Sequence, residues 1–193
     1  MHKTLLLLVS LIIFNRLDAT TFNGYIVTLE QDTLQGILIF NDENTFRFED
    51  EFLLRNSVKA EVNGQIWKFK AEDVLCYAVN LRGSWKIYYG VKTAADEYTF
   101  MKKEVVGPLS LYSGMTYSDV IHKPTYYFLL QKKATNEFLY LQMNDSANSK
   151  SIIHFLSECE EVTGKLVKRE LVPTKIPDWN LMADTYNESC GGS

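Results

Sequence analysis

Short runs of β-branched and aromatic residues recur at intervals of about 8–12 positions along most of this chain, and this spacing is typical of a mainly β fold. The runs cover residues 25–29, 33–40, 45–48, 58–62, 65–69, 74–79, 85–91, 98–105, 109–112, 126–131 and 138–143. Asn63-Gly64, between two of them, is the strongest two-residue hairpin signal in the sequence. No helical pattern separates the runs, so parallel strands joined by crossover helices are disfavoured. We predict about nine or ten antiparallel strands in a bent sheet, a sandwich or a partly open barrel.

Helical periodicity replaces the strand pattern in the last part of the chain. Residues 144–149 form a polar linker, and Ser149 or Ser151 can cap the helix that follows. Apolar residues then recur at helical spacing up to Pro173, and Asp178 is the predicted N-cap of a last helix. We predict that these helices cover one face or edge of the sheet.

The first 19 residues have the order of a secretory signal peptide. A basic start with Lys3 precedes an apolar run over residues 5–14, and a short polar stretch ends on the small residue Ala19. The run is too short for a membrane-spanning helix, which needs about 20 apolar residues. We therefore expect export to the periplasm or the cell surface, with cleavage after Ala19. The expected organisation is a signal peptide over residues 1–19, a β-rich domain over residues 20–145, and a helical segment over residues 146–193 packed on that domain.

Charge and motifs exclude several classes of partner and reaction. The chain has a formal net charge of −4, so it lacks the basic footprint of a nucleic-acid binder and a polybasic patch for anionic membranes. It contains no His-x-x-x-His pair, no Cys-x-x-Cys, no Gly-x-Ser-x-Gly and no glycine-rich phosphate loop. We therefore predict no catalytic residue, no metal site, no cofactor, no nucleic-acid partner and no transmembrane segment in the mature chain.

Isolated polar residues are interpreted as structural rather than catalytic. His122 lies in a predicted loop and His154 in the first predicted helix. We expect a turn residue at position 122, and at position 154 either a helix-surface residue or a capped core imidazole, rather than bases or metal ligands. An acidic cluster lacks the later glycine and the closing glutamate of a calcium loop, and solvated turns explain it better. This cluster consists of Asp42, Glu43, Glu49, Asp50 and Glu51.

The chain is rich in aromatic residues, with 11 Tyr, 11 Phe and 3 Trp. Those in or beside predicted strands include Trp67, Trp85, Tyr88, Tyr89, Tyr112, Tyr126 and Tyr127. An exposed aromatic row can stack on sugars or grip an apolar ligand, whereas a small β core uses the same residues for packing. We favour the core. Because neighbours in a strand point to opposite faces, Tyr88 and Tyr89 are predicted to separate, as are Tyr126 and Tyr127.

The three cysteines fall into two groups. Cys76 lies between Leu75 and Tyr77, a context typical of a buried free thiol. Cys159 and Cys190 both lie near the C-terminus, where an oxidising compartment would allow them to form a disulfide. The odd number of cysteines and the Gly-Gly-Ser tail after Cys190 argue against a rigid framework, so both states of this pair stay open at this point.

Several segments of the mature chain carry a family resemblance. They are GYIVTL (24–29) followed by DTLQG (32–36), AEDVLCY (71–77), GPLSLY (107–112), FLSECEE (155–161) and YN (186–187). Together they resemble an uncharacterised family of exported proteins that is common in Bacteroidota. Members usually show Gly-Asp-Thr-Leu-x-Gly, and here Gln31 replaces the first Gly, while Ala71 and Cys76 are further departures. The resemblance implies a secreted β-rich domain with a helical tail, and it brings no established activity.

The same resemblance implies candidate O-glycosylation sites. Exported proteins of these bacteria carry O-glycans on Ser or Thr that follow Asp and precede an aliphatic or small residue. Thr33 and Ser146 fit this pattern, and both lie in predicted turns or linkers. Ser146 is favoured because a linker should be exposed.

These observations favour a binding or interaction module of the bacterial envelope rather than an enzyme. Export, many short strands, abundant aromatics and the lack of catalytic motifs motivate this prediction, with an envelope protein or a glycan as the partner. Two alternatives stay open. One is a carrier that holds lipid or another apolar ligand in an aromatic-lined cavity. The other is a hydrolase with two carboxylates that face each other about 5–10 Å apart across a cleft.

Overall fold

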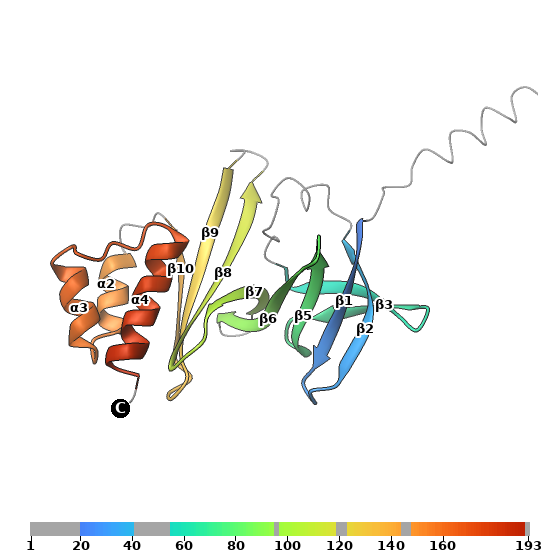
Figure 1. Cartoon of the computed structure of the whole chain (residues 1–193), viewed down its shortest axis with the longest axis horizontal. Coiled ribbons are helices and arrows are strands. Elements are labelled where there is room, and N and C mark those ends of the chain that lie inside the picture. The colour runs from blue at the N-terminus through green and yellow to red at the C-terminus, as the bar shows by residue number, and fades with distance from the viewer. Residues whose placement is uncertain (1–19, 41–54, 95–96, 119–122, 144–147, 192–193) are drawn as a thin grey trace, which may run out of the picture.

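The chain folds into a ten-stranded antiparallel sheet followed by three helices, as its computed structural model shows (Figure 1). The structure describes residues 20–40, 55–94, 97–118, 123–143 and 148–191. The strands are β1 (Thr20–Thr28), β2 (Thr33–Phe40), β3 (Ser57–Val62), β4 (Gln65–Lys70), β5 (Val74–Leu81), β6 (Ser84–Ala94), β7 (Glu97–Val105), β8 (Leu109–Ser118), β9 (Lys123–Lys132) and β10 (Phe138–Gln142). The predicted mainly β fold with C-terminal helices is confirmed, in the form of an open sheet. The predicted signal peptide and the predicted strand at 45–48 lie outside the described residues.

The sheet is built almost entirely from hairpins between consecutive strands. Its order is β10-β9-β8-β7-β6-β5-β1-β2-β3-β4, so β5 returns to pair with β1 and every other neighbour is consecutive in the chain. The predicted hairpin at Asn63-Gly64 is present, with φ of 53° and 77° at the two turn residues. Arg82-Gly83 forms a second turn of this kind between β5 and β6, with φ of 51° and 86°. Positive φ at both central residues matches the twist of the flanking strands.

Alternation along the strands divides the side chains between two faces of the sheet. Tyr88 packs in a core cluster of the N-terminal half, whereas its neighbour Tyr89 packs in a smaller cluster on the other face. Tyr126 packs beneath the helices, and Tyr127 joins the same smaller cluster as Tyr89. The predicted separation within both pairs is therefore confirmed. Buried residues thus lie on both faces of the sheet.

Three helices cover one face of the sheet at its C-terminal end, α2 (Asn148–Phe155), α3 (Glu160–Val167) and α4 (Ile176–Ser189) (Figure 1). Their apolar residues share one core cluster with β8, β9 and β10. Within it the rings of Phe128 and Trp179 stack, with centroids 4.5 Å apart. None of the helices in the described ranges is long and apolar enough to cross a membrane. The helical segment therefore packs on the sheet as predicted.

The start of α4 differs from the prediction, in which Asp178 was the N-cap. The N-cap is Lys175, and Asp178 occupies the third helical position. The Asp178 carboxylate accepts hydrogen bonds from the backbone N–H groups of Thr174 and Lys175, at 3.2 and 3.1 Å. The helix begins earlier because Pro177 lies within the first turn, where its missing N–H has no intrahelical partner to lose. Asp178 thus closes the helix start from inside the helix.

Two glycines are expected to respond in opposite directions to replacement by alanine. A Cβ at Gly90 in β6 would collide with the backbone carbonyl oxygen of Ala71, whereas a Cβ at Gly164 in α3 would meet nothing within 4 Å. Gly90→Ala should therefore cost about 1–3 kcal/mol of unfolding free energy through overpacking. Gly164→Ala should add about 0.5–1 kcal/mol through helix propensity. Urea unfolding followed by circular dichroism measures both, and a shift of the same sign in both variants would contradict this assignment.

Candidate functional site

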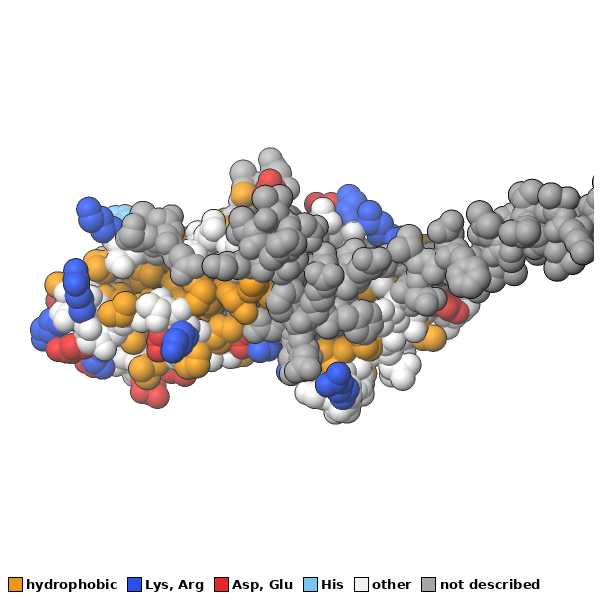
Figure 2. All heavy atoms as spheres, turned by 90° about the horizontal axis from the view of Figure 1, so that it is seen from above, with side chains coloured by type: hydrophobic (Ala, Val, Ile, Leu, Met, Phe, Trp, Pro, Cys, Tyr) orange, Lys and Arg blue, Asp and Glu red, His pale blue; other side chains and the backbone are white. Residues whose placement is uncertain are grey.

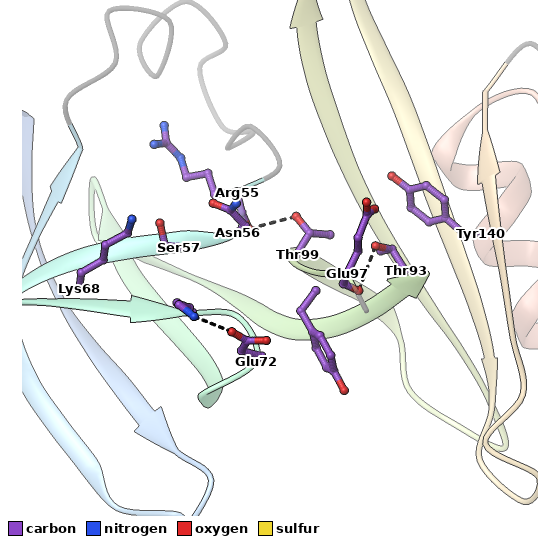
Figure 3. A pocket seen from close by; sticks show the side chains of 11 residues that line it. Arg55, Asn56, Ser57, Lys68, Glu72, Thr93, Glu97, Thr99 and Tyr140 are labelled. Carbon is purple, nitrogen blue, oxygen red and sulfur yellow. Dashed lines mark hydrogen bonds and ion pairs between the residues drawn. The ribbon is translucent and has the colours of Figure 1, made fainter. Parts of the chain in front are cut away.

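A groove of about 830 Å³ lies between the β3–β4 hairpin and the hairpin that joins β6 to β7 (Figure 3). Arg55, Ser57 and Lys68 line one side, Thr99 lies between, and Tyr140 of β10 lies on the opposite side. The groove is open to solvent, and most of the side chains along it are polar. Its walls come from strands far apart in the sequence, so the bending of the sheet creates it.

The backbone around Arg55 fixes the two walls relative to each other. Arg55 forms an isolated bridge with Phe100 of β7, and the Phe100 N–H donates to the Arg55 carbonyl at 2.7 Å. The Thr99 hydroxyl donates to the same carbonyl at 3.0 Å. The Ala71 N–H donates to the carbonyl of Asn56 at 2.8 Å. These bonds hold the residues before β3 against β7 and against the turn before β5, so the groove is part of the rigid sheet.

The β3–β4 side of the groove carries most of its positive charge. The guanidinium of Arg55 lies 5.1 Å from the centre of the Phe40 ring, in a cation–π contact. Lys70 forms an ion pair with Glu72 at 2.8 Å, and this hydrogen bond raises the pKa of the Lys70 ammonium. Lys68 is exposed and has no ion pair among the described residues. Lys68 is therefore the cation on this side that is open to a ligand.

The opposite side of the groove combines a carboxylate with hydroxyl groups. The Thr93 hydroxyl donates to the backbone carbonyl of Glu97 at 3.4 Å. Tyr140 stacks on Tyr127 with ring centres 5.5 Å apart. Burial, the neighbouring Tyr127 and the charge of Glu97 raise the pKa of Tyr140 to about 12. This side thus offers the Tyr140 hydroxyl as a hydrogen-bond donor and the Glu97 carboxylate as a negative charge, facing the cations across the groove.

The predicted site residues lie apart from this groove. Thr33 is exposed at the start of β2, directly after the turn that follows β1. Ser146, His122 and the acidic cluster at 42–51 lie outside the described residues. His154 is exposed on α2, which is the helix-surface alternative, and Cys76 is a buried free thiol, as predicted. Burial raises the pKa of the Cys76 thiol.

The Cys159 and Cys190 sulfurs are bonded, with an S–S distance of 2.00 Å. Cys159 is the N-cap residue of α3, and Cys190 follows the last residue of α4. The bond therefore ties the beginning of one helix to the end of another. Their Cα atoms lie 5.7 Å apart, a separation typical of disulfides.

The prediction that the strand tryptophans belong to the core is wrong for Trp67 and Trp85. Their exposed fractions are 52% and 50%. Trp67 is exposed because β4 is the last strand of the sheet, and Trp85 because it follows the tight turn between β5 and β6. The ring of Trp85 lies 5.4 Å from that of Tyr25. The remaining tryptophan, Trp179 of α4, is the one in the core.

A second polar cluster resembles a catalytic arrangement in composition only. The Ser113 hydroxyl donates to the Glu104 carboxylate at 2.5 Å, and Lys102 forms an ion pair with the same carboxylate at 2.9 Å. The adjoining cavity measures about 20 Å³, room for about one water molecule. The serine therefore has no space beside it for a substrate, and the cluster satisfies buried polar groups between the two main cores. In the described ranges, no group of three or more His, Cys, Asp or Glu residues is placed to hold a metal ion.

A third polar cluster joins the helices to the sheet and should make stability fall at alkaline pH. The Tyr186 hydroxyl donates to the Glu158 carboxylate at 2.7 Å, and Lys132 pairs with the same oxygen at 2.7 Å. Burial and the bond to Glu158 raise the pKa of Tyr186 to about 12. Because the folded pKa lies above the unfolded value of about 10, this contribution is complete below pH 10 and is lost as pH rises through 12.

We expect the variant Tyr186→Phe to be less stable than the wild type at neutral pH and to lose less stability between about pH 9 and 11.5. Urea unfolding at several pH values measures this difference. Other buried tyrosines contribute alkaline sensitivity to both proteins, so the comparison isolates Tyr186. Identical slopes for the two proteins would contradict the assignment.

The sequence contained no signal for the groove. Lys68, Thr99 and Tyr140 belong to β4, β7 and β10, and none stands in a recognisable motif. Figure 2 shows positively and negatively charged side chains interspersed around the helical end of the molecule, so the face in view carries no patch of a single charge there.

Comparison with known proteins gave no matching family model, no matching curated protein and no matching solved structure.

Proposed function

We propose that this chain is an exported binding module of the bacterial envelope and that the groove between β3–β4 and the β6–β7 hairpin is its ligand-binding surface. The observation that carries this proposal is the lining of the groove, which combines cations, hydroxyl groups and aromatic rings on a rigid sheet. Side chains of this kind bind polar ligands through hydrogen bonds and ion pairs, and tyrosines supply contact area at low entropic cost. An envelope protein or glycan is the partner class that fits.

The polar lining supports this function over the carrier of an apolar ligand. A lipid site is expected to be mainly apolar and enclosed. Here the large groove is open and polar, and the cavity beside Ile176 and Met115 has room for about one water molecule. A more apolar hollow of about 400 Å³, beside Ile153 and Val167 on the helices, is open to solvent rather than enclosed. The buried side chains of the described strands pack against one another in three clusters.

The hydrolase alternative is supported by one observation, since the carboxylates of Glu72 and Glu97 both line the groove. Glu72 is held by Lys70 in an ion pair, which suits a structural role. The variant Glu97→Gln separates the two functions. A hydrolase would lose turnover of oligosaccharide substrates with binding retained, whereas a binding module would have no turnover to lose.

Site-directed photocrosslinking in cells tests the proposed function. A benzoylphenylalanine in place of Tyr98, which lines the groove and is 36% exposed, should form a discrete adduct with the partner. The matched control carries the same amino acid in place of Val167, which is 66% exposed on α3. An adduct from position 98 alone supports the groove, and mass spectrometry of the adduct tells protein from glycan. Equal adducts from both positions, or none from position 98, would contradict it.

A further inference from the structure

In the part of the chain that the structure describes, β4 is an edge strand with one side unpaired. β4 is the last strand of the sheet and pairs with β3. No strand within the described ranges lies on its other side. Ile66 and Trp67 are 66% and 52% exposed, and Lys68 and Lys70 are exposed as well. Such an edge offers backbone N–H and C=O groups to any extended segment that can pair with it.

The hairpin register decides which backbone groups of β4 point outward. The turn residues 63–64 both have positive φ, as expected for a two-residue hairpin. The flanking residues, Val62 and Gln65, then exchange both backbone hydrogen bonds. Because bonding direction alternates along a strand, Ile66 and Lys68 turn their N–H and C=O groups to the open edge. A ladder of four hydrogen bonds is thus available.

The side chains beside this ladder favour negative charge. Lys68 lies directly opposite Lys59 of β3, and like charges in this position are unfavourable. Neither lysine has an ion pair among the described residues. Glu61, opposite Ile66, is the acidic residue on this face of the hairpin. A carboxylate next to Lys68 would relieve the repulsion between the two lysines.

We propose that β4 binds an extended acidic segment of a partner protein, which adds to the sheet as an eleventh strand. Its backbone pairs with Ile66 and Lys68, and its carboxylates lie beside Lys68 and Lys59. A second β4 edge does not supply this charge, because its sequence QIWKFK contains no carboxylate to place beside Lys68. The expected partner is thus a different protein that carries an acidic extended segment.

The inference rests on the proposed function and names the class of its partner. Lys68 and Lys70 line the groove as well as belonging to β4, so the added strand would run along the wall of the groove. The two proposals can still fail separately. An adduct from position 98 together with an unoccupied β4 edge would leave the groove in place and remove the added strand.

Hydrogen exchange with a synthetic peptide tests the added strand. The probe is a blocked peptide of about nine residues in which Val alternates with Glu. At saturation we expect the amides of Ile66 and Lys68 to exchange at least about tenfold more slowly. Two control peptides carry Lys in place of Glu, or N-methyl groups on the backbone nitrogens that would face β4. Neither control should protect these amides.

Three variants, two at Ile66 and one at Lys68, separate backbone pairing from charge. Ile66→Pro removes an outward N–H, which an edge strand tolerates, and Ile66→Thr keeps it. We expect the proline variant to bind the Glu peptide about tenfold more weakly than the threonine variant. Lys68→Glu should weaken binding of the Glu peptide and strengthen binding of the Lys peptide. This second test remains valid even if the proline variant fails to fold.

Three results with the peptides would overturn the proposal, and a fourth comes from the protein alone. They are equal binding of the N-methylated peptide, protection by the Glu peptide at amides outside β4, and no binding of the Glu peptide at millimolar concentration. Protection of the β4 amides that grows with protein concentration alone would also overturn it, since the occupant would then be a second copy of the chain.

Discussion

Replacement of Trp179 by alanine is expected to destabilise the fold by about 3–5 kcal/mol, the cost of removing a large buried aromatic side chain. Trp179 is 2% exposed, and its ring stacks on Phe128 with centres 4.5 Å apart. The contact joins α4 to β9, so its loss leaves a cavity in the core that the helices share with the sheet. Against a typical total stability of about 5–15 kcal/mol, this is a large fraction.

Two further variants sharpen the Trp179 prediction. Trp67→Ala, on the exposed edge strand, should cost less than about 1 kcal/mol, since surface changes are small. Trp179→Phe keeps the stacked ring and removes an indole N–H that has no hydrogen-bond partner. Its cost should lie well below that of Trp179→Ala, because the cavity it leaves is smaller. Urea unfolding of the three variants gives the order, and a cost for Trp67→Ala equal to that for Trp179→Ala would refute it.

Loss of the disulfide between Cys159 and Cys190 should have the second largest effect. The bond closes a loop with a sequence separation of 31 residues. In the chain-entropy model, a loop of this length contributes about 3–4 kcal/mol by restricting the unfolded chain. The double variant Cys159→Ala, Cys190→Ala should lose about this amount, plus a smaller packing loss at the buried Cys159.

Reductant provides the control for the disulfide prediction. Dithiothreitol should lower the unfolding free energy of the wild type and leave the double variant unchanged. Cys76→Ala removes the buried free thiol and should keep the full sensitivity to reductant. Titration of the unfolded, unreduced protein should find one thiol, and three thiols would show that the bond does not form.

Local sequence patterns predicted the elements of the fold well where the physical cause is local. Asn63-Gly64 tolerates positive φ at both positions, so the hairpin it forms depends on few other residues. The alternation at Tyr88 and Tyr89 follows from the pleat of a strand. The start of α4 was misplaced because Pro177 is compatible with two registers, one before the helix and one inside its first turn.

Local sequence patterns did not predict the candidate site. Lys68 and Tyr140 are 72 positions apart in numbering and meet at one groove only because the strands between them bend the sheet. Trp67, Trp85 and Trp179 are chemically alike, yet one packs in the core and two lie at the surface. Their positions depend on which strand became the edge and where the helices docked.

By itself, the sequence determined the class of this fold, since hairpin turns and two-residue alternation are properties of neighbouring residues. It also determined that helices follow the strands, because the apolar period changes from two to 3.6. Only the tertiary structure decided that β5 returns to β1, that β4 is left as an open edge, and that cations and hydroxyl groups face each other across a groove. These features depend on contacts between residues far apart in the chain, and local sequence patterns do not determine the energies of such contacts.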